Sequence, residues 1–459
     1  MAGKTKRVGA DLTNGPILKA LIAFVGPIIL ANLIQQLYSL VDLMVIGQFM
    51  GSTGTVGVST GGEISDMLTP VATSFGAAGQ IIIGQLAGAR EREKMNRAIG
   101  TLISLMIVFS LVFLSCTLVF RIQLLELLNC PKEAFSQAKA YMVITAFGFP
   151  YIFGYNAVCG ILRGLGESKY PMMFIIIAAV VNIFLDVLLV GPFQMEAAGT
   201  AIATVLSQVA ACVAAGIYLY RRKEHTGFEM KSSSFRIDGA SAKMILTLGI
   251  PQVIRSLMVR FSMLYVNASV NAYGLVESAT NGVGNKLQKF LEVYTTSFSE
   301  AASAMVAQNL GAKKTDRASK TILYSFYSCL VLGTITSALV LLFPRQLFGI
   351  FNRDAVVMEM GVSYLQILIV HIYLSCLTST FQAMVTGSGF VSMNFAIGIL
   401  DGVVCKIGLA LLFAYALGLG VYGFWWGTAL SRLLPGIICV IYFVSGKWKT
   451  RRLLTEQKH

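Results

Sequence analysis

The sequence predicts an all-α integral membrane protein, with twelve transmembrane helices in two six-helix lobes related by a pseudo-two-fold axis along the membrane normal. Three observations lead to this prediction: the composition, the number of long apolar runs, and a repeat of the first half in the second. Of the 459 residues, 56% are hydrophobic and 13% are charged, whereas soluble domains carry about 25% charged residues. The mean hydropathy of +0.72 points the same way.

The apolar runs are long enough to cross a hydrocarbon core that is about 30 Å thick. The second and the eighth are less hydrophobic and rich in Gly, Ser and Thr, which favours helices that line a cavity over helices that face lipid. The predicted spans are 17–48, 54–86, 98–120, 137–162, 171–192, 196–220, 243–272, 275–309, 319–343, 360–387, 391–418 and 421–446.

The positions of lysine and arginine predict the orientation of these spans, because cytoplasmic loops are enriched in both residues. With the N-terminus placed in the cytoplasm, 25 of the 36 fall on the cytoplasmic side, 5 on the outer side and 6 within spans. We therefore expect a multi-pass protein of the bacterial plasma (inner) membrane, with both termini cytoplasmic. Charges that cluster in membrane loops also explain the net charge of +14 without a nucleic-acid partner.

One long polar stretch divides the chain. We expect an N-lobe at 1–220, a cytoplasmic inter-lobe linker at 221–242, a C-lobe at 243–446 and a basic cytoplasmic tail at 447–459. Residues of the first half recur in the second at an offset of 223 or 224. Because six spans is an even number, the copies are parallel repeats, which suits alternating access around a central cleft. The recurring pairs include Pro27 and Pro251, Gln85 and Gln308, Tyr141 and Tyr364, Gly199 and Gly423, Thr204 and Thr428, and Ser207 and Ser431.

The first span carries two features that an inert membrane anchor does not need. Pro27 removes a backbone hydrogen bond and can kink the helix. Asp42 lies near the far end of the span, after Tyr38 and Ser39. A carboxylate at membrane depth is expensive and usually faces a protein interior or a wet cavity.

These features together resemble the multidrug and toxic compound extrusion (MATE) transporters. The resemblance covers nearly the whole chain, and the order and spacing of its motifs make it specific. It implies export of small organic compounds, often cationic or amphipathic, driven by inward flow of H⁺ or Na⁺. The segments that carry it are Pro27 through Asp42, Gly84 through Gly88, Arg163 through Gly166, Asn182 through Asp186, and Gln308 through Gly311.

The resemblance also implies where the coupling cation binds. The expected N-lobe site consists of Asp42, Asn182, Asp186 and Thr204, with Asn156 nearby. One branch of the family has a further acidic cluster on its seventh and tenth helices. Here the tenth span carries His371 and no acid, and the seventh carries arginines, which favours coupling through the N-lobe.

The residue types support this site independently of the resemblance. Asn182 and Asp186 are four residues apart and share one helix face. With Asp42 they offer hard oxygen ligands that suit Na⁺, and two carboxylates in one site also suit a proton. The alternative is a set of polar residues that neighbouring helices satisfy. Thr204 is explained equally well by helix packing, because its copy Thr428 lies in the lobe without the carboxylates.

Two charged pairs suggest a gate. Glu63 and Asp66 lie three residues apart in the second span, and the repeat places Lys286 and Lys289 opposite them in the eighth. We therefore expect an electrostatic latch between the lobes when the outer side closes. The alternative is pairing within each lobe, for example between Lys289 and Glu292.

The spans of the second half carry an excess of positive charge. Arg255 is a candidate for substrate or counter-charge binding, and Tyr265 belongs to a candidate apolar substrate surface, although such residues more often serve helix packing. Local pairing, for example of Arg432 with Asp401, is the alternative for the cations. The sequence leaves both open.

The sequence contains no nucleotide-binding loop, nucleophile elbow or metal-ligand cluster, so we expect neither an enzyme nor a cofactor. Cation-coupled multidrug antiport by a monomer in the lipid bilayer is the favoured function. A flippase for a lipid-linked precursor is the alternative, because an anionic headgroup needs cations like those of the second half. A channel is a third possibility, which the kinked helices and the repeat disfavour.

Overall fold

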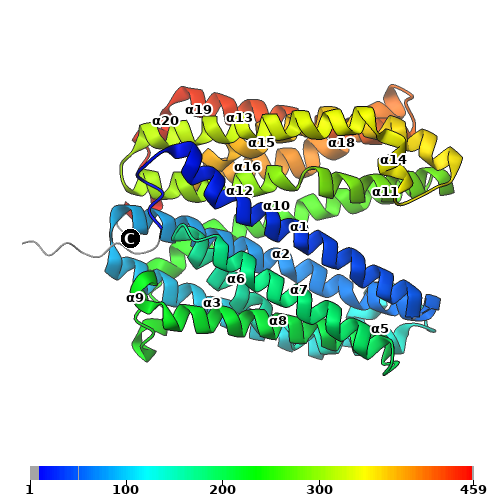
Figure 1. Ribbon diagram of the computed structural model, residues 1–459, viewed down its shortest axis with the longest axis horizontal. Helices are drawn as coiled ribbons and strands as arrows, with labels where there is room; N and C mark the ends of the chain where they lie inside the picture. Colours follow the sequence, from blue (N-terminus) through cyan, green and yellow to red (C-terminus); the bar gives the residue numbers. More distant parts are fainter. Residues whose placement is uncertain (1–9, 50, 457–459) are drawn as a thin grey trace, which may run out of the picture. The chain divides into compact units, whose positions relative to one another are not determined.

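The computed structural model describes residues 10–49 and 51–456, and over these residues the chain forms helices and no strand (Figure 1). The predicted fold class, an all-α integral membrane protein, is confirmed. The first half contains α1 (Ile17–Phe49), α2 (Gly51–Ala89), α3 (Arg92–Val119), α4 (Arg121–Leu127), α5 (Phe135–Ala146), α6 (Phe149–Gly164), α7 (Lys169–Val190), α8 (Glu196–Arg221), α9 (Lys223–Thr226) and the 3₁₀ turn η1 (Ser232–Phe235).

The second half begins with the long helix α10, and two π-helical segments, η2 and η3, interrupt its later part. Its elements are α10 (Gly239–Asn271), α11 (Leu275–Leu291), α12 (Val293–Gly311), α13 (Thr315–Leu342), α14 (Pro344–Gly349), α15 (Ala355–Gly387), α16 (Val391–Ile399), η2 (Leu400–Cys405), α17 (Lys406–Leu411), η3 (Leu412–Ala416), α18 (Val421–Leu430), α19 (Leu433–Ser445), α20 (Lys447–Thr450) and the 3₁₀ turn η4 (Leu454–Glu456).

Ten helices of the described chain are long and apolar enough to span a membrane, and α5 with α6, bent by 45°, gives an eleventh candidate. The remaining predicted span, 275–309, is divided at Glu292 into α11 and α12. The polar residues Glu277, Lys286 and Lys289 lie on α11 and lower its hydropathy. The difference from twelve predicted spans is therefore confined to this polar pair of helices.

The described residues form two compact units. The first contains Gly26–Gly249, and the second contains Leu12–Val25 together with the chain from Ile250 onward. Two continuous helices pass from one unit to the other: α1 between Val25 and Gly26, and α10 between Gly249 and Ile250. Each passage lies within two residues of a helix-interior proline, Pro27 or Pro251. Because proline removes a helical hydrogen bond, both passages coincide with the point where the helix is easiest to bend.

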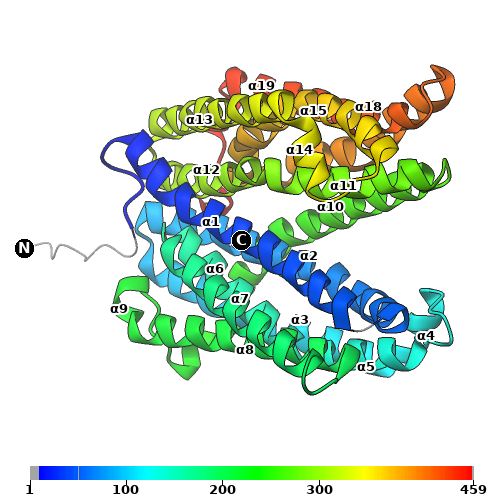
Figure 2. The same cartoon turned by 45° about the vertical axis from the view of Figure 1, so that its right-hand side comes forward.

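In the first unit, α2 packs against α5 and α6, and α7 packs against α8. Figure 2 shows α6, α7 and α8 running side by side. A small apolar cluster joins the end of α1 to this bundle. It contains Val45, Ile46, Val58, Tyr141, Val190, Ala197 and Ala201.

The polar stretch before α10 packs on α3 of the first unit. Ser104 Oγ donates to the Phe235 carbonyl at 2.6 Å, and the Asp238 N–H donates to Thr101 Oγ1 at 3.0 Å. Gly100 permits this approach, because a Cβ there would lie 1.6 Å from the Ser234 carbonyl oxygen.

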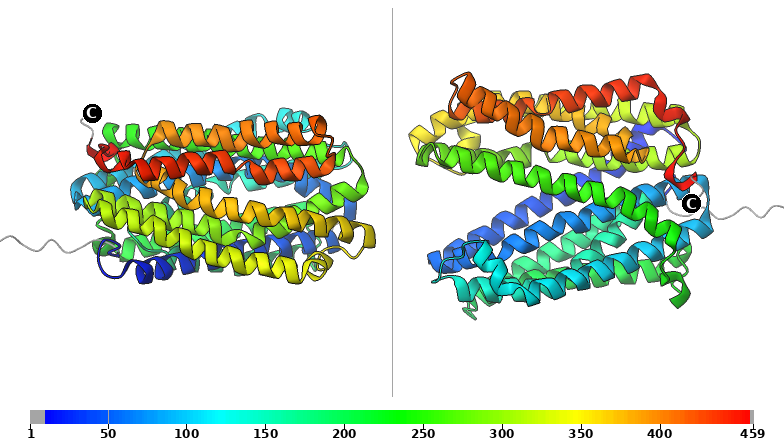
Figure 3. Two further views of the ribbon diagram at one scale, coloured as in Figure 1. Left: turned by 90° about the horizontal axis from the view of Figure 1, so that it is seen from above. Right: turned by 180° about the vertical axis from the view of Figure 1, so that it is seen from behind.

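In the second unit, α15 packs against α11, α12, α13, α18 and α19, and α17 packs against α18 (Figure 3). The residues before α1 dock on this unit. Arg317 donates to the Gly15 and Asn14 carbonyls at 2.6 and 2.8 Å, and Lys314 Nζ donates to Asn14 Oδ1 at 2.6 Å. The segment before the first helix of each repeat is thus held by side chains of the other half of the sequence.

Candidate functional site

The first unit brings three predicted site residues into its interior. Asn182 and Asp186 lie one turn apart on α7 and are 4% and 1% exposed. Asp42 comes from α1, and its carboxyl group interacts directly with that of Asp186. Asn182 and Asp186 therefore share one face of α7, as their i, i+4 spacing predicts, and α1 adds the second carboxylate.

Four side-chain oxygen atoms of these three residues have no hydrogen-bond donor. Asp42 Oδ1, Asn182 Oδ1 and both carboxylate oxygens of Asp186 are buried and accept no hydrogen bond. Buried polar atoms normally find a partner, because an unsatisfied one costs about 1–3 kcal/mol. Two carboxylates in contact also repel each other when both are charged. A bound cation would relieve both problems.

Tyr141 of α5 and Thr204 of α8 complete the surroundings. Their side chains lie next to each other, and the Tyr141 phenol lies within electrostatic reach of Asp42 and Asp186. Tyr141 also belongs to the apolar cluster at the end of α1. Thr204 is therefore next to Tyr141, which in turn lies near the two aspartates.

Asn156 uses its side chain within its own helix. Its Nδ2 donates to the Ile152 carbonyl at 2.8 Å. Its backbone packs closely against Gly76 of α2, where a Cβ would lie 2.8 Å from the Asn156 carbonyl oxygen. These contacts give Asn156 a role in joining α6 to α2.

No group of three or more His, Cys, Asp or Glu side chains within residues 10–49 and 51–456 is placed to hold a metal ion. A site of two aspartates and one asparagine has a different make-up, and its ligands suit H⁺ or a weakly held Na⁺.

The predicted gate residues occupy two helices. Glu63 is half-buried and Asp66 exposed on α2, whereas Lys286 and Lys289 are exposed on α11. The suggested pair between Lys289 and Glu292 is not formed in the described structure. Glu292 instead faces α15, where its Oε2 lies 3.5 Å from His371 Nε2.

The second unit encloses a polar cavity of about 130 Å³. Residues of α10, α11, α15, α17 and α18 line it, with Arg432 at the start of α19. The polar lining residues are Asn267, Asn281, Asn285, Gln288, Tyr364, His371, Lys406, Trp425, Thr428 and Arg432.

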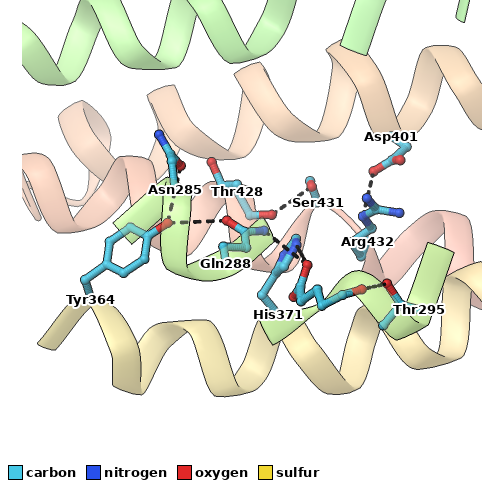
Figure 4. Close-up of polar contacts among 10 residues, drawn as sticks. Asn285, Gln288, Thr295, Tyr364, His371, Asp401, Thr428, Ser431 and Arg432 are labelled. Carbon is cyan, nitrogen blue, oxygen red and sulfur yellow. Dashed lines mark hydrogen bonds and ion pairs between the residues drawn. The ribbon is translucent and has the colours of Figure 1, made fainter. Parts of the chain in front are cut away.

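Hydrogen bonds connect the amides of this cavity (Figure 4). The Tyr364 hydroxyl donates to Asn285 Oδ1 at 3.4 Å and to Gln288 Oε1 at 3.3 Å. Gln288 Nε2 donates to Glu292 Oε2 at 3.3 Å. One turn before Asn285 on α11, Asn281 Oδ1 accepts from Trp425 Nε1 at 3.3 Å. The lining is therefore held in place before any ligand arrives.

Charged groups lie at one side of the cavity. Arg432 Nε is 3.6 Å from Asp401 Oδ1, an ion pair that Figure 4 shows and that the sequence offered as an alternative. Asp401 lies in the π-helical segment η2, and Lys406 follows it. Since π-helical hydrogen bonds join residues i and i+5, Asp401 and Lys406 point to the same side.

The other two candidates of the second half lie elsewhere. Arg255 Nη2 donates to Gln382 Oε1 at 3.3 Å, and its side chain packs against Gly398. Tyr265 lines a separate hollow of about 520 Å³ with Tyr273 and Tyr415. Neither lines the cavity with Lys406.

The repeat in the sequence could have identified two further residues near the sites. Tyr141 and Tyr364 recur at an offset of 223, as Thr204 and Thr428 do at 224. Tyr141 lies beside the acids of the first unit, and Tyr364 and Thr428 line the cavity of the second. Lys406 is one of the six lysines and arginines within the predicted spans, and a single sequence does not show that its side chain faces a cavity.

Known proteins resemble the chain over nearly its full length. The probable multidrug resistance protein YoeA of Bacillus subtilis is 25% identical over 442 residues, which are 95% of each chain. The multidrug export protein MepA of Staphylococcus aureus is 22% identical over 428 residues, which are 93% of this chain and 94% of MepA.

Solved structures share the fold. The outward-facing conformation of a multidrug resistance MATE family transporter of the MOP superfamily superposes with a TM-score of 0.89 at 22% identity, over 95% of this chain and 97% of that one. The family model MatE matches twice, at residues 27–188 and 251–412. Because these two matches cover most of both halves, the chain belongs to the MatE family of membrane transporters.

Proposed function

We propose that this transporter exports structurally varied small organic compounds by multidrug antiport, and that inward movement of H⁺ or Na⁺ drives the export. The printed names of YoeA and MepA, a multidrug resistance protein and a multidrug export protein, support this substrate class. The flippase alternative finds no support among these relatives.

The coupling cation binds between α1 and α7 at Asp42, Asn182 and Asp186. One observation carries this assignment: four buried oxygen atoms of these side chains lack a hydrogen-bond donor. A cation would satisfy several of these atoms at once and offset the repulsion between the carboxylates. A proton shared by the two aspartates and a sodium ion held by all three residues would each meet this need.

Coupling requires that the filled and empty sites favour different states of the protein. Asp42 lies on the same helix as Pro27, close to which α1 passes from one unit to the other. Cation binding at Asp42 would therefore act on the helix that belongs to both units. This connection supports alternating access, with the prolines in α1 and α10 as the points of bending.

Dye efflux tests the assignment. Wild type and Asp42→Asn would be expressed in bacteria, and everted membrane vesicles would be prepared from the cells. Ethidium transport by these vesicles would be followed under an imposed pH gradient or an imposed Na⁺ gradient. We expect one gradient to drive ethidium transport by wild type. In Asp42→Asn the gradient-driven rate should be at least about tenfold lower, because the amide removes one of the two charges that bind the cation.

Glu133→Gln is the matched control, because Glu133 is an exposed carboxylate of the first unit outside the spans. It makes the same chemical change and should transport as wild type does. Normal export by Asp42→Asn under both gradients would exclude the proposed coupling site.

A further inference from the structure

The cavity of the second unit occupies a place related by the repeat to the cation site of the first. The two family-model matches begin 224 residues apart and end 224 residues apart. At this offset Asp42 corresponds to Val266, and Asn182 corresponds to Lys406. Val266, Lys406 and Thr428, the last of which corresponds to Thr204, all line the cavity. The acidic site of one repeat is thus replaced by a basic site in the other.

Lys406 is the residue of this cavity that indicates the charge of a ligand. Its side chain is only 7% exposed and contributes to the cavity lining. It makes no hydrogen bond or ion pair with any other described residue, and Asp401 acts on it only at longer range. A buried ammonium group without a close counter-charge is costly, because burial removes its hydration. No acidic side chain of the described residues therefore lies in ion-pair contact with Lys406.

The nearby acids contact other side chains and form no ion pair with Lys406. Asp401 forms an ion pair with Arg432, and Glu292 faces His371. Arg255, which also interacts with Asp401, adds a third positive charge to the neighbourhood. Among the lysine and arginine residues of the cavity lining, Arg432 has an acid within ion-pair distance and Lys406 has none among the described residues. A ligand with a negative charge would supply one.

The rest of the lining indicates an organic anion. Beside Lys406 and Arg432 the cavity has the apolar side chains Val259, Met263 and Val266 and the ring of Trp425. At about 130 Å³ the cavity is somewhat smaller than the cavity of about 150 Å³ that holds benzene, so the ligand has to be small. The fixed amides of α10 and α11, one of which bonds to Trp425, offer further polar contacts.

We propose that the cavity between α10, α11, α15, α17 and α18 binds a small organic carboxylate, which forms an ion pair with Lys406 and lies against Trp425. The proposal goes beyond cation-coupled export and does not depend on the coupling site at Asp42. It assigns to the second unit a ligand opposite in charge to the cation of the first.

Trp425 allows a direct test with benzoate as the probe. The chain has three tryptophans, Trp425, Trp426 and Trp448. In the purified full-length W426F/W448F variant, Trp425 alone reports on the cavity. We expect benzoate to change its fluorescence saturably, and we expect benzamide, which has the same shape without the charge, to bind at least about tenfold more weakly.

Lys406→Met in the same background removes the ammonium group but keeps an apolar side chain of similar length. We expect it to weaken benzoate binding at least about tenfold, because the ion pair is lost. Lys320→Met, a matched change at an exposed position of α13, should bind benzoate as the parent does.

Three results would overturn the proposal: no saturable binding of benzoate to the parent, equal binding of benzoate and benzamide, or binding to Lys406→Met within about twofold of the parent. If Lys406→Met fails to fold, the comparison of benzoate with benzamide in the parent still decides. Asp42→Asn should bind benzoate normally, so failure of the coupling site and failure of this cavity give different results.

Discussion

Single residues show opposite charge at related places in the two repeats. Asp42 and Asp186 make the site of the first unit acidic, whereas Lys406 and Arg432 make the cavity of the second unit basic. Tyr141 and its copy Tyr364 lie at both places. The repeat has therefore kept an aromatic hydroxyl and changed the charge around it.

Tyr141 is a residue-scale test of the first site. Tyr141→Phe keeps the ring in the apolar cluster and removes the hydroxyl that lies next to Thr204 and within electrostatic reach of the two aspartates. We expect gradient-driven ethidium efflux to fall several-fold, while the melting temperature of the purified protein falls by no more than a few degrees. A melting temperature that collapses together with transport would show a purely structural role.

The sequence identified some of these residues and not their partners. Asp42, Asn182 and Asp186 were predictable because intramembrane carboxylates are rare and the i, i+4 spacing fixes a shared face. The contact of Glu292 with His371 joins two helices that are far apart in the sequence. No periodicity within one helix encodes such a contact, and in the described residues Glu292 contacts His371 and Gln288, not Lys289.

Among the structural elements of the second unit, interrupted helices supply charged groups in and around the cavity. Glu292 lies at the break between α11 and α12, and Asp401 and Lys406 lie in and directly after the π-helical segment η2. Apolar runs predict where helices cross the membrane. They contain little information about π-helical turns, because the same residues can also continue an α-helix.

The segment before α10 offers a test at this scale. Gly100→Ala places a Cβ 1.6 Å from the Ser234 carbonyl oxygen, so the segment has to leave α3 or shift. We expect a lower melting temperature and faster trypsin cleavage at Lys231 or Arg236, because undocking exposes the backbone.

Gly216→Ala on α8 is the control. Nothing lies within 4 Å of the added Cβ, and alanine favours the helix by about 1 kcal/mol over glycine. It should leave cleavage unchanged and raise stability slightly. Equal cleavage of Gly100→Ala and wild type would show that the docking is dispensable.

On the scale of the whole molecule, the chain consists of two units that exchange helix ends. α1 and α10 each belong to both units, and each passes between them close to a proline. The predicted repeat explains why two such helices exist. The sequence did not reveal that residues 12–25 associate with the second unit, because this depends on contacts of Asn14 and Gly15 with Lys314 and Arg317.

The gate is a prediction at this scale. Glu63 and Asp66 are expected to attract Lys286 and Lys289 when the outer side closes, since the repeat gives the two pairs related positions. Glu63→Lys should strongly reduce ethidium efflux, and the added change Lys286→Glu should restore a substantial part of it. If the double variant is no better than Glu63→Lys alone, the latch has no support.

The two proposed sites divide the molecule into a first unit that binds the coupling cation at Asp42 and Asp186 and a second that binds an acidic organic group at Lys406. One preparation of wild type and Asp42→Asn tests this division, with ethidium transport under H⁺ or Na⁺ gradients measured in proteoliposomes and benzoate binding measured on the same purified protein. We predict that Asp42→Asn loses gradient-driven transport and binds benzoate with wild-type affinity. Gradient-driven transport that persists in Asp42→Asn at the wild-type rate would exclude cation coupling through Asp42.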